Sequence, residues 1–283
     1  MILLIGDIGG TSSRWALLSS PDDETRTIDL PGFNPVTGDP VAMQAALRQS
    51  GIGGEAENGP LKVIAYGAGC GAKARADLLR TALAEVWPHA HIQVETDLLG
   101  AARGLYGSDA GLVLILGTGM NVGYYDGSAL HMPMPSLGYI LGDEGSGADI
   151  GKHLLRDALY GVLPEPLKDR LFPDGLDLAS VLGSTYRSSG PQAYLASFTA
   201  LLADHLEETY VHDLVASRFF ALTRLLARCF SAQELQQVRA SGSVALGFRQ
   251  VLTEALGQRR MHLTAVERDP LPGLAAYHAQ AIP

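Results

Sequence analysis

Residues 3–18 and residues 111–125 share one pattern: an apolar strand, a glycine-rich turn and a second apolar strand. The first reads Leu-Leu-Ile-Gly-Asp-Ile-Gly-Gly-Thr-Ser-Ser-Arg-Trp-Ala-Leu-Leu, and the second reads Gly-Leu-Val-Leu-Ile-Leu-Gly-Thr-Gly-Met-Asn-Val-Gly-Tyr-Tyr. A dinucleotide fingerprint or a P-loop requires a helix after its glycines, and no helical pattern follows the first turn. The repetition therefore predicts two duplicated halves, each with a hairpin whose N–H and hydroxyl groups can bind phosphate.

Composition and charge exclude several classes of function. The chain has 283 residues, of which 47% are hydrophobic, which is enough for two domains with sizeable cores. Its net charge of −9 argues against binding to a nucleic-acid backbone or an anionic membrane. No apolar run approaches the length of a membrane span. Cys70 and Cys229 lie far apart without metal-ligand spacing, so we expect a cytoplasmic protein.

Three polar residues near predicted strand ends are candidates for chemistry. Asp7 stands at the mouth of the first turn, where a carboxylate could hold Mg²⁺ directly or through water. Asp97 follows a predicted strand at residues 91–94 and precedes a helix, so it is either an N-cap, an active-site residue or both. Asn34 lies among turn-forming residues 31–35, which form either a plain loop or a site that offers an amide to a polar ligand.

Three further glycine-rich segments precede predicted helices. Residues 142–146, Gly-Asp-Glu-Gly-Ser, place two carboxylates between glycines, which favours close approach of a ligand over a plain helix start. Residues 241–245, Ser-Gly-Ser-Val-Ala, open a helix after a strand and can accept adenine or ribose against bare backbone. Residues 67–71 follow a strand at 61–66, and their glycines favour close packing of that strand on a helix at 74–87, with Cys70 as a packed residue.

The pattern predicts an α/β fold of two domains, residues 1–109 and residues 110–283. The second carries a helical insertion at about residues 152–230, with long helices at 193–206 and 211–230. Strands are expected at 236–240 and 262–266, with a helix between them that ends near residue 256.

Taken in order, these segments resemble the actin–hexokinase–Hsp70 ATPase superfamily, with residues 6–11 and 116–119 as its two phosphate loops and residues 241–245 as its adenosine loop. Within it the chain is similar to the N-acetylglucosamine kinase group of the BadF/BadG/BcrA/BcrD type. The marks of that group are Gly-Phe-Asn-Pro at 32–35, Tyr-Gly-Ala-Gly-Cys at 66–70, Thr-Asp at 96–97, Gly-Thr-Gly-x-Asn at 117–121 and Gly-Asp-Glu-Gly-Ser at 142–146.

The resemblance implies two ribonuclease H-like domains with mixed sheets flanked by helices and a cleft between them. It implies an ATP-dependent kinase that phosphorylates the 6-hydroxyl of N-acetylglucosamine, with Asp97 as general base and Asp7 organising Mg²⁺. The implied sugar-binding residues are Asn34, Thr118, Gly119, Gly138 and Asp143. The implied nucleotide-binding residues are Gly9, Gly10, Thr11, Ser12, Gly117, Thr118, Asn121, Gly242, Ser243 and Ala245. The expected partners are an amino sugar and ATP, and a homodimer is left open.

One departure concerns the sugar. Animal N-acetylglucosamine kinases carry a Trp that packs on the sugar, and here the segment at residues 135–138 is Pro-Ser-Leu-Gly, with Leu137 in that place. A related amino sugar such as N-acetylmuramic acid is therefore an alternative substrate. Two other functions on the same fold stay open: an ATPase activator of a reductase or dehydratase, and a non-catalytic sugar sensor. The activators hold an iron–sulfur cluster with paired cysteines, whereas Cys70 and Cys229 fall in other places.

Overall fold

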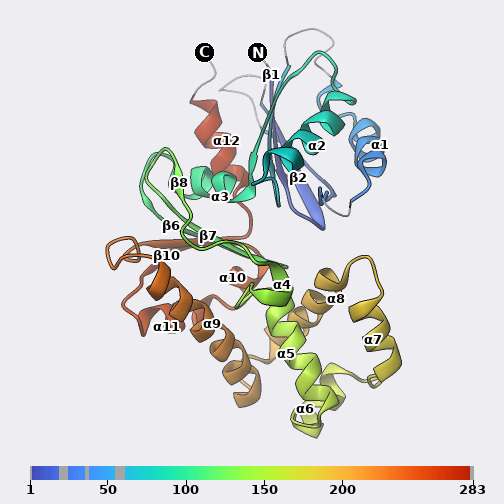
Figure 1. Cartoon of the computed structure of the whole chain (residues 1–283), viewed down its shortest axis with the longest axis vertical. Helices are drawn as coiled ribbons and strands as arrows, with labels where there is room; N and C mark the ends of the chain where they lie inside the picture. Colours follow the sequence, from blue (N-terminus) through green and yellow to red (C-terminus); the bar gives the residue numbers. More distant parts are fainter. Residues whose placement is uncertain (1, 19–24, 36–37, 55–60, 281–283) are drawn as a thin grey trace. The chain divides into compact units, whose positions relative to one another are not determined.

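The computed structural model of the chain describes residues 2–18, 25–35, 38–54 and 61–280. The chain divides into two compact units, each with its own five-stranded mixed sheet (Figure 1). Unit 1 comprises residues 1–109, 127–129 and 269–283, and unit 2 comprises residues 110–126 and 130–268. In the described part of the chain, no helix has the length and apolar character that crossing a membrane requires.

The sheet of unit 1 has the strand order β3-β2-β1-β4-β5. Strands β1 (Ile2–Ile8), β2 (Ser12–Leu18) and β3 (Arg26–Pro31) are antiparallel, whereas β4 (Leu61–Gly67) and β5 (His91–Thr96) continue the sheet in parallel from β1. Sequence patterning misses β3 because it is an edge strand with a largely exposed, weakly apolar sequence.

Both faces of this sheet are covered, so its central strands are apolar throughout. Alternate residues of β1 point to opposite faces: Leu4 and Ile8 lie in one core cluster, and Leu3 and Ile5 lie in another. Helices α1 (Pro40–Ser50) and α2 (Lys73–Ala84) cover the first face, and α3 (Asp97–Tyr106) and α12 (Leu271–Ala279) cover the second (Figure 1).

Gly6 in β1 leaves room for a large aromatic side chain. A Cβ at this position would lie 2.6 Å from the ring of Trp15, which is fully buried. The Trp15 ring in turn lies 5.9 Å from the ring of Trp87, between centroids. The core of unit 1 on this face therefore contains two neighbouring indoles, whose planes are tilted by 58°.

Unit 2 repeats the topology of unit 1, as the duplicated sequence pattern predicts. Its strand order is β10-β9-β6-β7-β8. Strands β6 (Gly111–Leu116), β7 (Met120–Tyr125) and β8 (Leu130–His131) are antiparallel, and β9 (Val238–Ser241) and β10 (Leu263–Glu267) extend the sheet in parallel from β6. The fold class expected from the sequence is confirmed.

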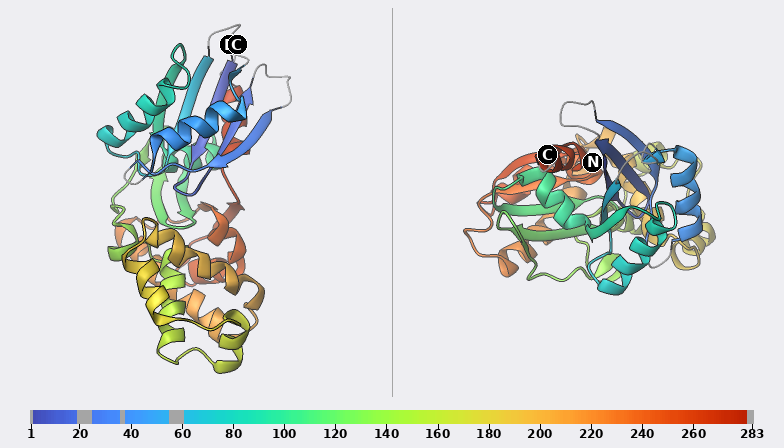
Figure 2. Two further views of the ribbon diagram at one scale, coloured as in Figure 1. Left: turned by 90° about the vertical axis from the view of Figure 1, so that its right-hand side faces the viewer. Right: turned by 90° about the horizontal axis from the view of Figure 1, so that it is seen from above.

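The chain between β8 and β9 is mainly helical. A short helix α4 (Gly138–Leu141) precedes α5 (Gly147–Leu159), and α9 (Thr209–Cys229) ends the series. Between them lie α6 (Glu165–Leu171), α7 (Leu178–Tyr186) and α8 (Pro191–Ser197), in the yellow-green to amber part of the colour scale, and α8 packs on α5 and α7 (Figure 2).

Two of the expected helices are interrupted. The helix expected at 193–206 is α8 followed by a 3₁₀ segment at Phe198–His205. The helix expected to run to residue 256 is split into α10 (Ser243–Gly247) and α11 (Arg249–Gly257), because Phe248 leaves the helical conformation. Apolar spacing continues across both breaks, so periodicity alone does not reveal them.

The C-terminal segment departs from the expected domain division. Residues 269–283 belong to unit 1, whereas the sequence places them in the second domain. Helix α12 packs on α3 through glycine: a Cβ on Gly273 would lie 1.9 Å from the carbonyl oxygen of Gly104. Such a backbone contact between distant segments leaves no hydrophobic pattern in the sequence.

We expect Gly273→Ala to lower the free energy of unfolding by about 1–3 kcal/mol, because the new methyl group overlaps the backbone of α3. Gly183→Ala in α7 is the matched control, since open space surrounds Gly183. The control is expected to gain roughly 0.5–1 kcal/mol, as alanine is the better helix former. Urea unfolding followed by circular dichroism compares the two, and equal effects would contradict the packing argument.

Candidate functional site

In unit 1 the carboxyl ends of the parallel strands bring candidate residues to one edge. Asp7 pairs in register with Tyr66 of β4, which pairs with Glu95 of β5. Asp97 follows two residues after Glu95, at the first position of α3. The N-cap of α3 is Thr96, whose hydroxyl accepts from Leu99 N at 3.2 Å, so the cap predicted at Asp97 lies one residue earlier.

The electrostatics of this edge are dominated by carboxylates. Burial, together with the charges of Asp97 and Asp269, raises the pKa of Asp7 to about 7, against a lowering effect of Arg14. Arg14 is bound to Asp29 and Asp269, each at 2.5 Å. Arg14 offsets this negative charge only in part, and the described residues include no cluster of three or more His, Cys, Asp or Glu side chains placed to hold a metal ion.

The β1–β2 hairpin is tied to the segment that carries Asn34. Gly9 N donates to Ser12 O at 2.9 Å and closes the turn, and Phe33 N donates to Gly9 O at 3.0 Å. Gly32 must lack a side chain, since a Cβ there would lie 2.3 Å from Gly9 O. Asn34 is therefore the residue after Phe33, which is hydrogen-bonded to the hairpin turn. Residues Gly10, Thr11 and Ser12 of that turn are exposed.

Cys70 lies in the glycine turn after β4 and is buried. Burial and the charge of Asp97 raise the pKa of its thiol to about 11. A thiol in that state is a poor nucleophile and a poor metal ligand, because the thiolate is the reactive form. The structure thus gives Cys70 the packing environment that the sequence favours.

In unit 2 three predicted segments meet through their backbones. Gly147 N and Ala148 N, at the start of α5, donate to the carbonyl oxygens of Gly117 and Thr118 at 2.8 and 3.1 Å. The third segment enters at Gly242, which has φ +113°, and a Cβ there would lie 2.2 Å from Leu116 O. The turn after β6, the loop before α5 and the start of α10 are therefore adjacent. Ser243 is exposed there, whereas Ala245 is fully buried in the core of unit 2, so its side chain packs in the core and does not face an open surface.

Asp143 is held in an unusual conformation. Its φ is +61°, one of two positive values among the described non-glycine residues, and the residue is only 4% exposed. Burial and the nearby Glu144 and Asp149 raise its pKa to about 6, against the lowering effects of the Met120 N–H and Lys152. Gln192 Nε2 donates to Asp143 Oδ2 at 3.2 Å. No local sequence signal identifies Gln192.

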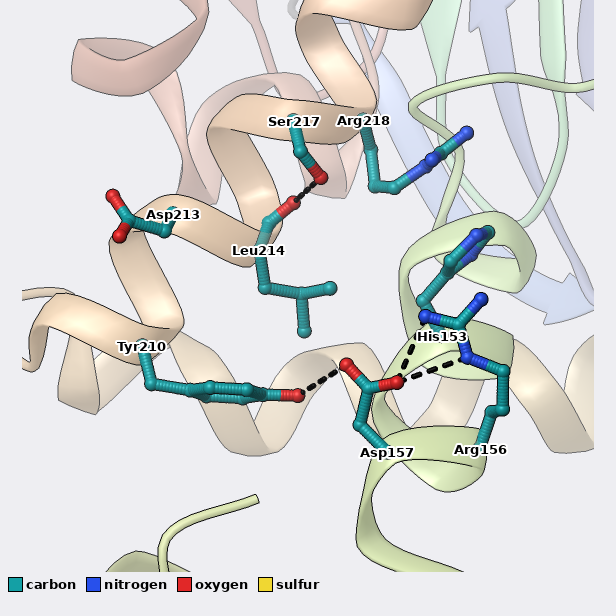
Figure 3. A pocket seen from close by; sticks show the side chains of 8 residues that line it. All are labelled: His153, Arg156, Asp157, Tyr210, Asp213, Leu214, Ser217 and Arg218. Atoms are coloured by element: carbon teal, nitrogen blue, oxygen red, sulfur yellow. Dashed lines mark hydrogen bonds and ion pairs between the residues drawn. The ribbon is translucent and has the colours of Figure 1, made fainter. Parts of the chain in front are cut away.

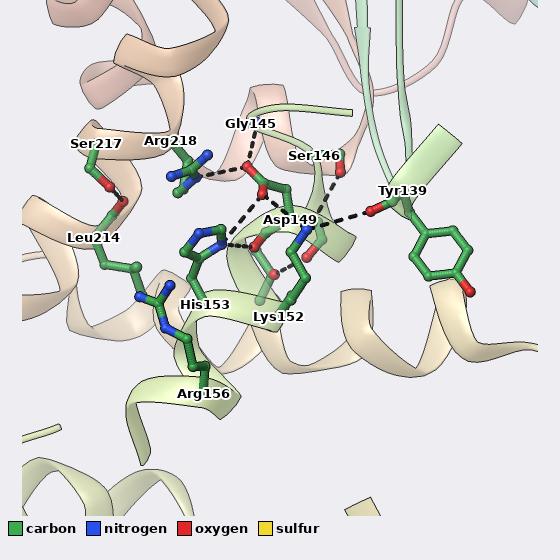
Figure 4. A network of polar contacts seen from close by, with 12 residues as sticks. Tyr139, Gly145, Ser146, Asp149, Lys152, His153, Arg156, Leu214, Ser217 and Arg218 are labelled. Carbon is green, nitrogen blue, oxygen red and sulfur yellow. Dashed lines mark hydrogen bonds and ion pairs between the residues drawn. The ribbon is translucent and has the colours of Figure 1, made fainter. Parts of the chain in front are cut away.

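The loop that carries Asp143 is fixed to the rest of unit 2 by a buried aspartate (Figure 4). Asp149 Oδ2 accepts from Gly145 N at 3.0 Å and from Arg218 Nε of α9 at 2.8 Å, while Asp149 N donates to Ser146 Oγ at 3.2 Å. Sequence patterning does not reveal this role of Asp149, although Ser146 and Asp149 have the spacing of a capping box.

A shallow pocket of about 380 Å³ lies between α5 and α9 (Figure 3). Its lining residues are His153, Arg156, Asp157, Tyr210, Asp213, Leu214, Ser217 and Arg218. Its charges are largely matched internally, because Arg156 pairs with Asp157, which also accepts from Tyr210 Oη at 2.9 Å. None of the sequence-predicted site residues lines it.

The remaining predicted residues also lie in these segments. Gly119 accepts from Gly117 N at 3.0 Å and closes the second turn. Asn121 belongs to β7, and its side-chain oxygen accepts from Val122 N at 3.1 Å. Gly138 has φ +73° at the start of α4, where Gly142 N donates back to its carbonyl oxygen at 2.8 Å.

No family model and no curated protein sequence matches the chain. A solved structure from Porphyromonas gingivalis, assigned as an N-acetylglucosamine kinase, is 35% identical with a TM-score of 0.84, covering 98% of this chain and 99% of that chain. A protein from Chromobacterium violaceum with the same assignment is 22% identical with a TM-score of 0.67, covering 98% of each chain. A glucokinase of the ROK family from Streptomyces griseus, in complex with glucose and AMPPNP, is 16% identical with a TM-score of 0.54, covering 98% of each chain. The two lower identities show the fold alone.

We expect Asp143→Asn to raise the free energy of unfolding at neutral pH by about 1 kcal/mol. The folded-state pKa of about 6 lies above the ordinary value of 3.8, so the stability that this group contributes falls as pH rises from about 4 to about 6. Asn tolerates a left-handed backbone and keeps an oxygen for Gln192. Urea unfolding across this pH range tests the expectation, which fails if the variant is less stable than the wild type at neutral pH.

For Asp149 we expect the free energy of unfolding to depend on pH in the opposite direction. Burial would raise its pKa, but hydrogen bonds from His153, Arg218 and Gly145 N outweigh burial and lower it to about 2. Its ionised form therefore stabilises the fold above pH 4, by about 1–2 kcal/mol, and this stabilisation is lost as pH falls from about 4 to about 2. Asp149→Asn should flatten the acid limb of the stability profile, and an unchanged limb would contradict the assignment.

Proposed function

Because the chain belongs to the N-acetylglucosamine kinase-like family of the actin–hexokinase–Hsp70 superfamily, we propose that it is an ATP-dependent sugar kinase acting on the 6-hydroxyl of N-acetylglucosamine. The observation that carries the proposal is the pair of carboxylates, Asp7 and Asp97, at one sheet edge of unit 1, where burial and then the charge of Asp97 raise the pKa of Asp7. Phosphoryl transfer needs such a pair: one acid to organise a cation and one to accept a proton.

In the proposed reaction the sugar hydroxyl oxygen attacks the γ-phosphorus of ATP. A new oxygen–phosphorus bond forms, the bond to the β,γ-bridging oxygen breaks, and ADP leaves. The carboxylate of Asp97 takes the hydroxyl proton, which is the role of a general base. The reaction yields a sugar phosphate, ADP and a proton, so the base must be reset by release of that proton to solvent.

The remaining residues would bind and orient the two substrates. The backbone N–H groups and hydroxyls of residues 9–12 and of residues 117–118 are donors suited to phosphate oxygens. Asp7 would hold Mg²⁺, which neutralises phosphate charge when bound. Asn34, Thr118 and Asp143 offer the amide, hydroxyl and carboxylate groups that recognise sugar hydroxyls, and Gly242 and Ser243 open the helix assigned to the adenosine.

Two features support the N-acetylglucosamine kinase assignment over an electron-transfer ATPase on this fold. The 35%-identical Porphyromonas gingivalis protein carries that assignment and is matched over 99% of its length. Cys70, which would have to bind an iron–sulfur cluster as a thiolate, is buried with a raised pKa.

Leu137 is 56% exposed and stands where animal N-acetylglucosamine kinases carry a tryptophan, so N-acetylmuramic acid is the substrate to compare with N-acetylglucosamine.

We expect Asp97→Asn to lower kcat for sugar-dependent ADP release by about 10²–10⁴-fold while the affinity for ATP stays within twofold, since an amide cannot accept the proton. A coupled ADP assay measures turnover and calorimetry measures ATP binding. The control is Asp77→Asn in α2, where the aspartate forms only surface ion pairs with Lys73 and Arg80.

The assay is run with N-acetylglucosamine, its 6-deoxy analogue and N-acetylmuramic acid. Turnover of the first without turnover of the 6-deoxy sugar supports the proposed acceptor atom. Near-normal activity of Asp97→Asn would remove the base assignment, and a wild-type chain that releases no ADP with any sugar would overturn the proposed function.

A further inference from the structure

Gln192 joins the helical part of unit 2 to the loop that carries Asp143. It is the second residue of α8, and its side-chain amide donates to Asp143 Oδ2 at 3.2 Å. Gly119 faces the same two groups: a Cβ there would lie 2.8 Å from Gln192 Nε2 and 3.0 Å from Asp143 Oδ2. The turn after β6, the loop before α5 and the start of α8 therefore converge on one carboxylate.

The orientation of that carboxylate needs support from outside its own loop. The left-handed conformation of Asp143 is unfavourable for a residue with a side chain, and neighbouring Gly142 and Gly145 leave the loop backbone permissive. The Met120 N–H and the Gln192 amide both bind the carboxylate, from two different elements. A carboxylate accepts about four hydrogen bonds, so two donors fix its plane and leave acceptor positions for a ligand.

We propose that Gln192 is a positioning residue for Asp143 in the sugar site, and that the helices inserted between β8 and β9 thereby take part in recognising the hydroxyl groups of the sugar. This proposal rests on the sugar-binding role of Asp143 in the proposed function. It explains why an amide suits the position: it donates to the carboxylate without adding charge. The proposal also explains why residue 119 is glycine, because a side chain there would displace the Gln192 amide.

The first test does not depend on catalysis. The titration of the Asp143 carboxyl is followed by carbon NMR, with the Asp143→Asn spectrum identifying its signal. Gln192→Glu is isosteric and places a second carboxylate at hydrogen-bond distance, so we expect the apparent pKa of Asp143 to rise by about one unit or more. The charged neighbours Glu144, Asp149 and Lys152 are unchanged in every variant.

The matched control is Gln250→Glu in α11. Gln250 also donates to a carboxylate, Glu254 Oε1 at 3.1 Å, but at an exposed site of the same unit. It is expected to leave the Asp143 titration and all kinetic constants unchanged. An Asp143 titration in Gln192→Glu that matches this control would overturn the proposal.

The second test separates KM from kcat. We expect Gln192→Ala to raise KM for the sugar about tenfold, as for the loss of one hydrogen bond to a charged group, with kcat and the KM for ATP within twofold. In Gln192→Glu the sugar KM should rise with pH as the paired carboxylates ionise. A general loss of kcat, or no change in KM, counts against positioning.

The outcomes for the two proposals are distinguishable. If the wild-type chain releases no ADP with any sugar, the kinase function fails, and the Asp143 titration alone decides whether Gln192 positions the carboxylate. If the wild type is active and Gln192→Ala behaves as the wild type does, the kinase function stands and the role of Gln192 fails. Gly119→Ala, whose Cβ would crowd both the Gln192 amide and the Asp143 carboxylate, should also raise the sugar KM.

Discussion

The arrangement of unit 2 depends on backbone groups that touch without intervening side chains. The N–H groups at the start of α5 donate to the carbonyl oxygens of Gly117 and Thr118, and Gly242 sits against the carbonyl of Leu116. Glycine is required at Gly242, where a Cβ would lie 2.2 Å from Leu116 O, whereas Thr118 and Ala148 make their backbone contact with side chains present. Because the segments are bound to one another directly, the turn, the acidic loop and the start of α10 form a single rigid feature.

Unit 1 also uses direct backbone contacts, but its candidate residues carry more negative charge. Its hairpin is also closed by backbone hydrogen bonds, and Gly32 lies against the turn at Gly9. The edge of its sheet gathers Asp7, Asp97 and Asp269, and burial, together with repulsion from the other two carboxylates, raises the pKa of Asp7. Unit 2 instead places one strained, buried carboxylate, Asp143, among neutral hydrogen-bond donors. The two units therefore share one sheet topology. They differ in the charged residues at their candidate sites.

The duplicated sheets could be predicted from the sequence because the strand–turn–strand pattern is local and strongly apolar. The strand β3 could not, since its exposed sequence has no such pattern, and neither could the packing of α12 on α3, which depends on Gly104 and Gly273 far apart in the chain. The candidate residues Asp7, Asp97 and Asp143 were found because glycines flank them or strand ends precede them. No glycine-rich segment or strand end marks Gln192 in the sequence, and only its hydrogen bond to Asp143 identifies it.

The placement of the indole rings has a practical consequence. The chain has two tryptophans, Trp15 and Trp87, and both belong to the core of unit 1, with ring centroids 5.9 Å apart. Intrinsic emission excited at the red edge of protein absorbance therefore reports on unit 1 alone, while far-ultraviolet ellipticity is weighted toward the helix-rich unit 2. Two optical signals thus follow the two halves of one polypeptide separately, with no label or added reporter group.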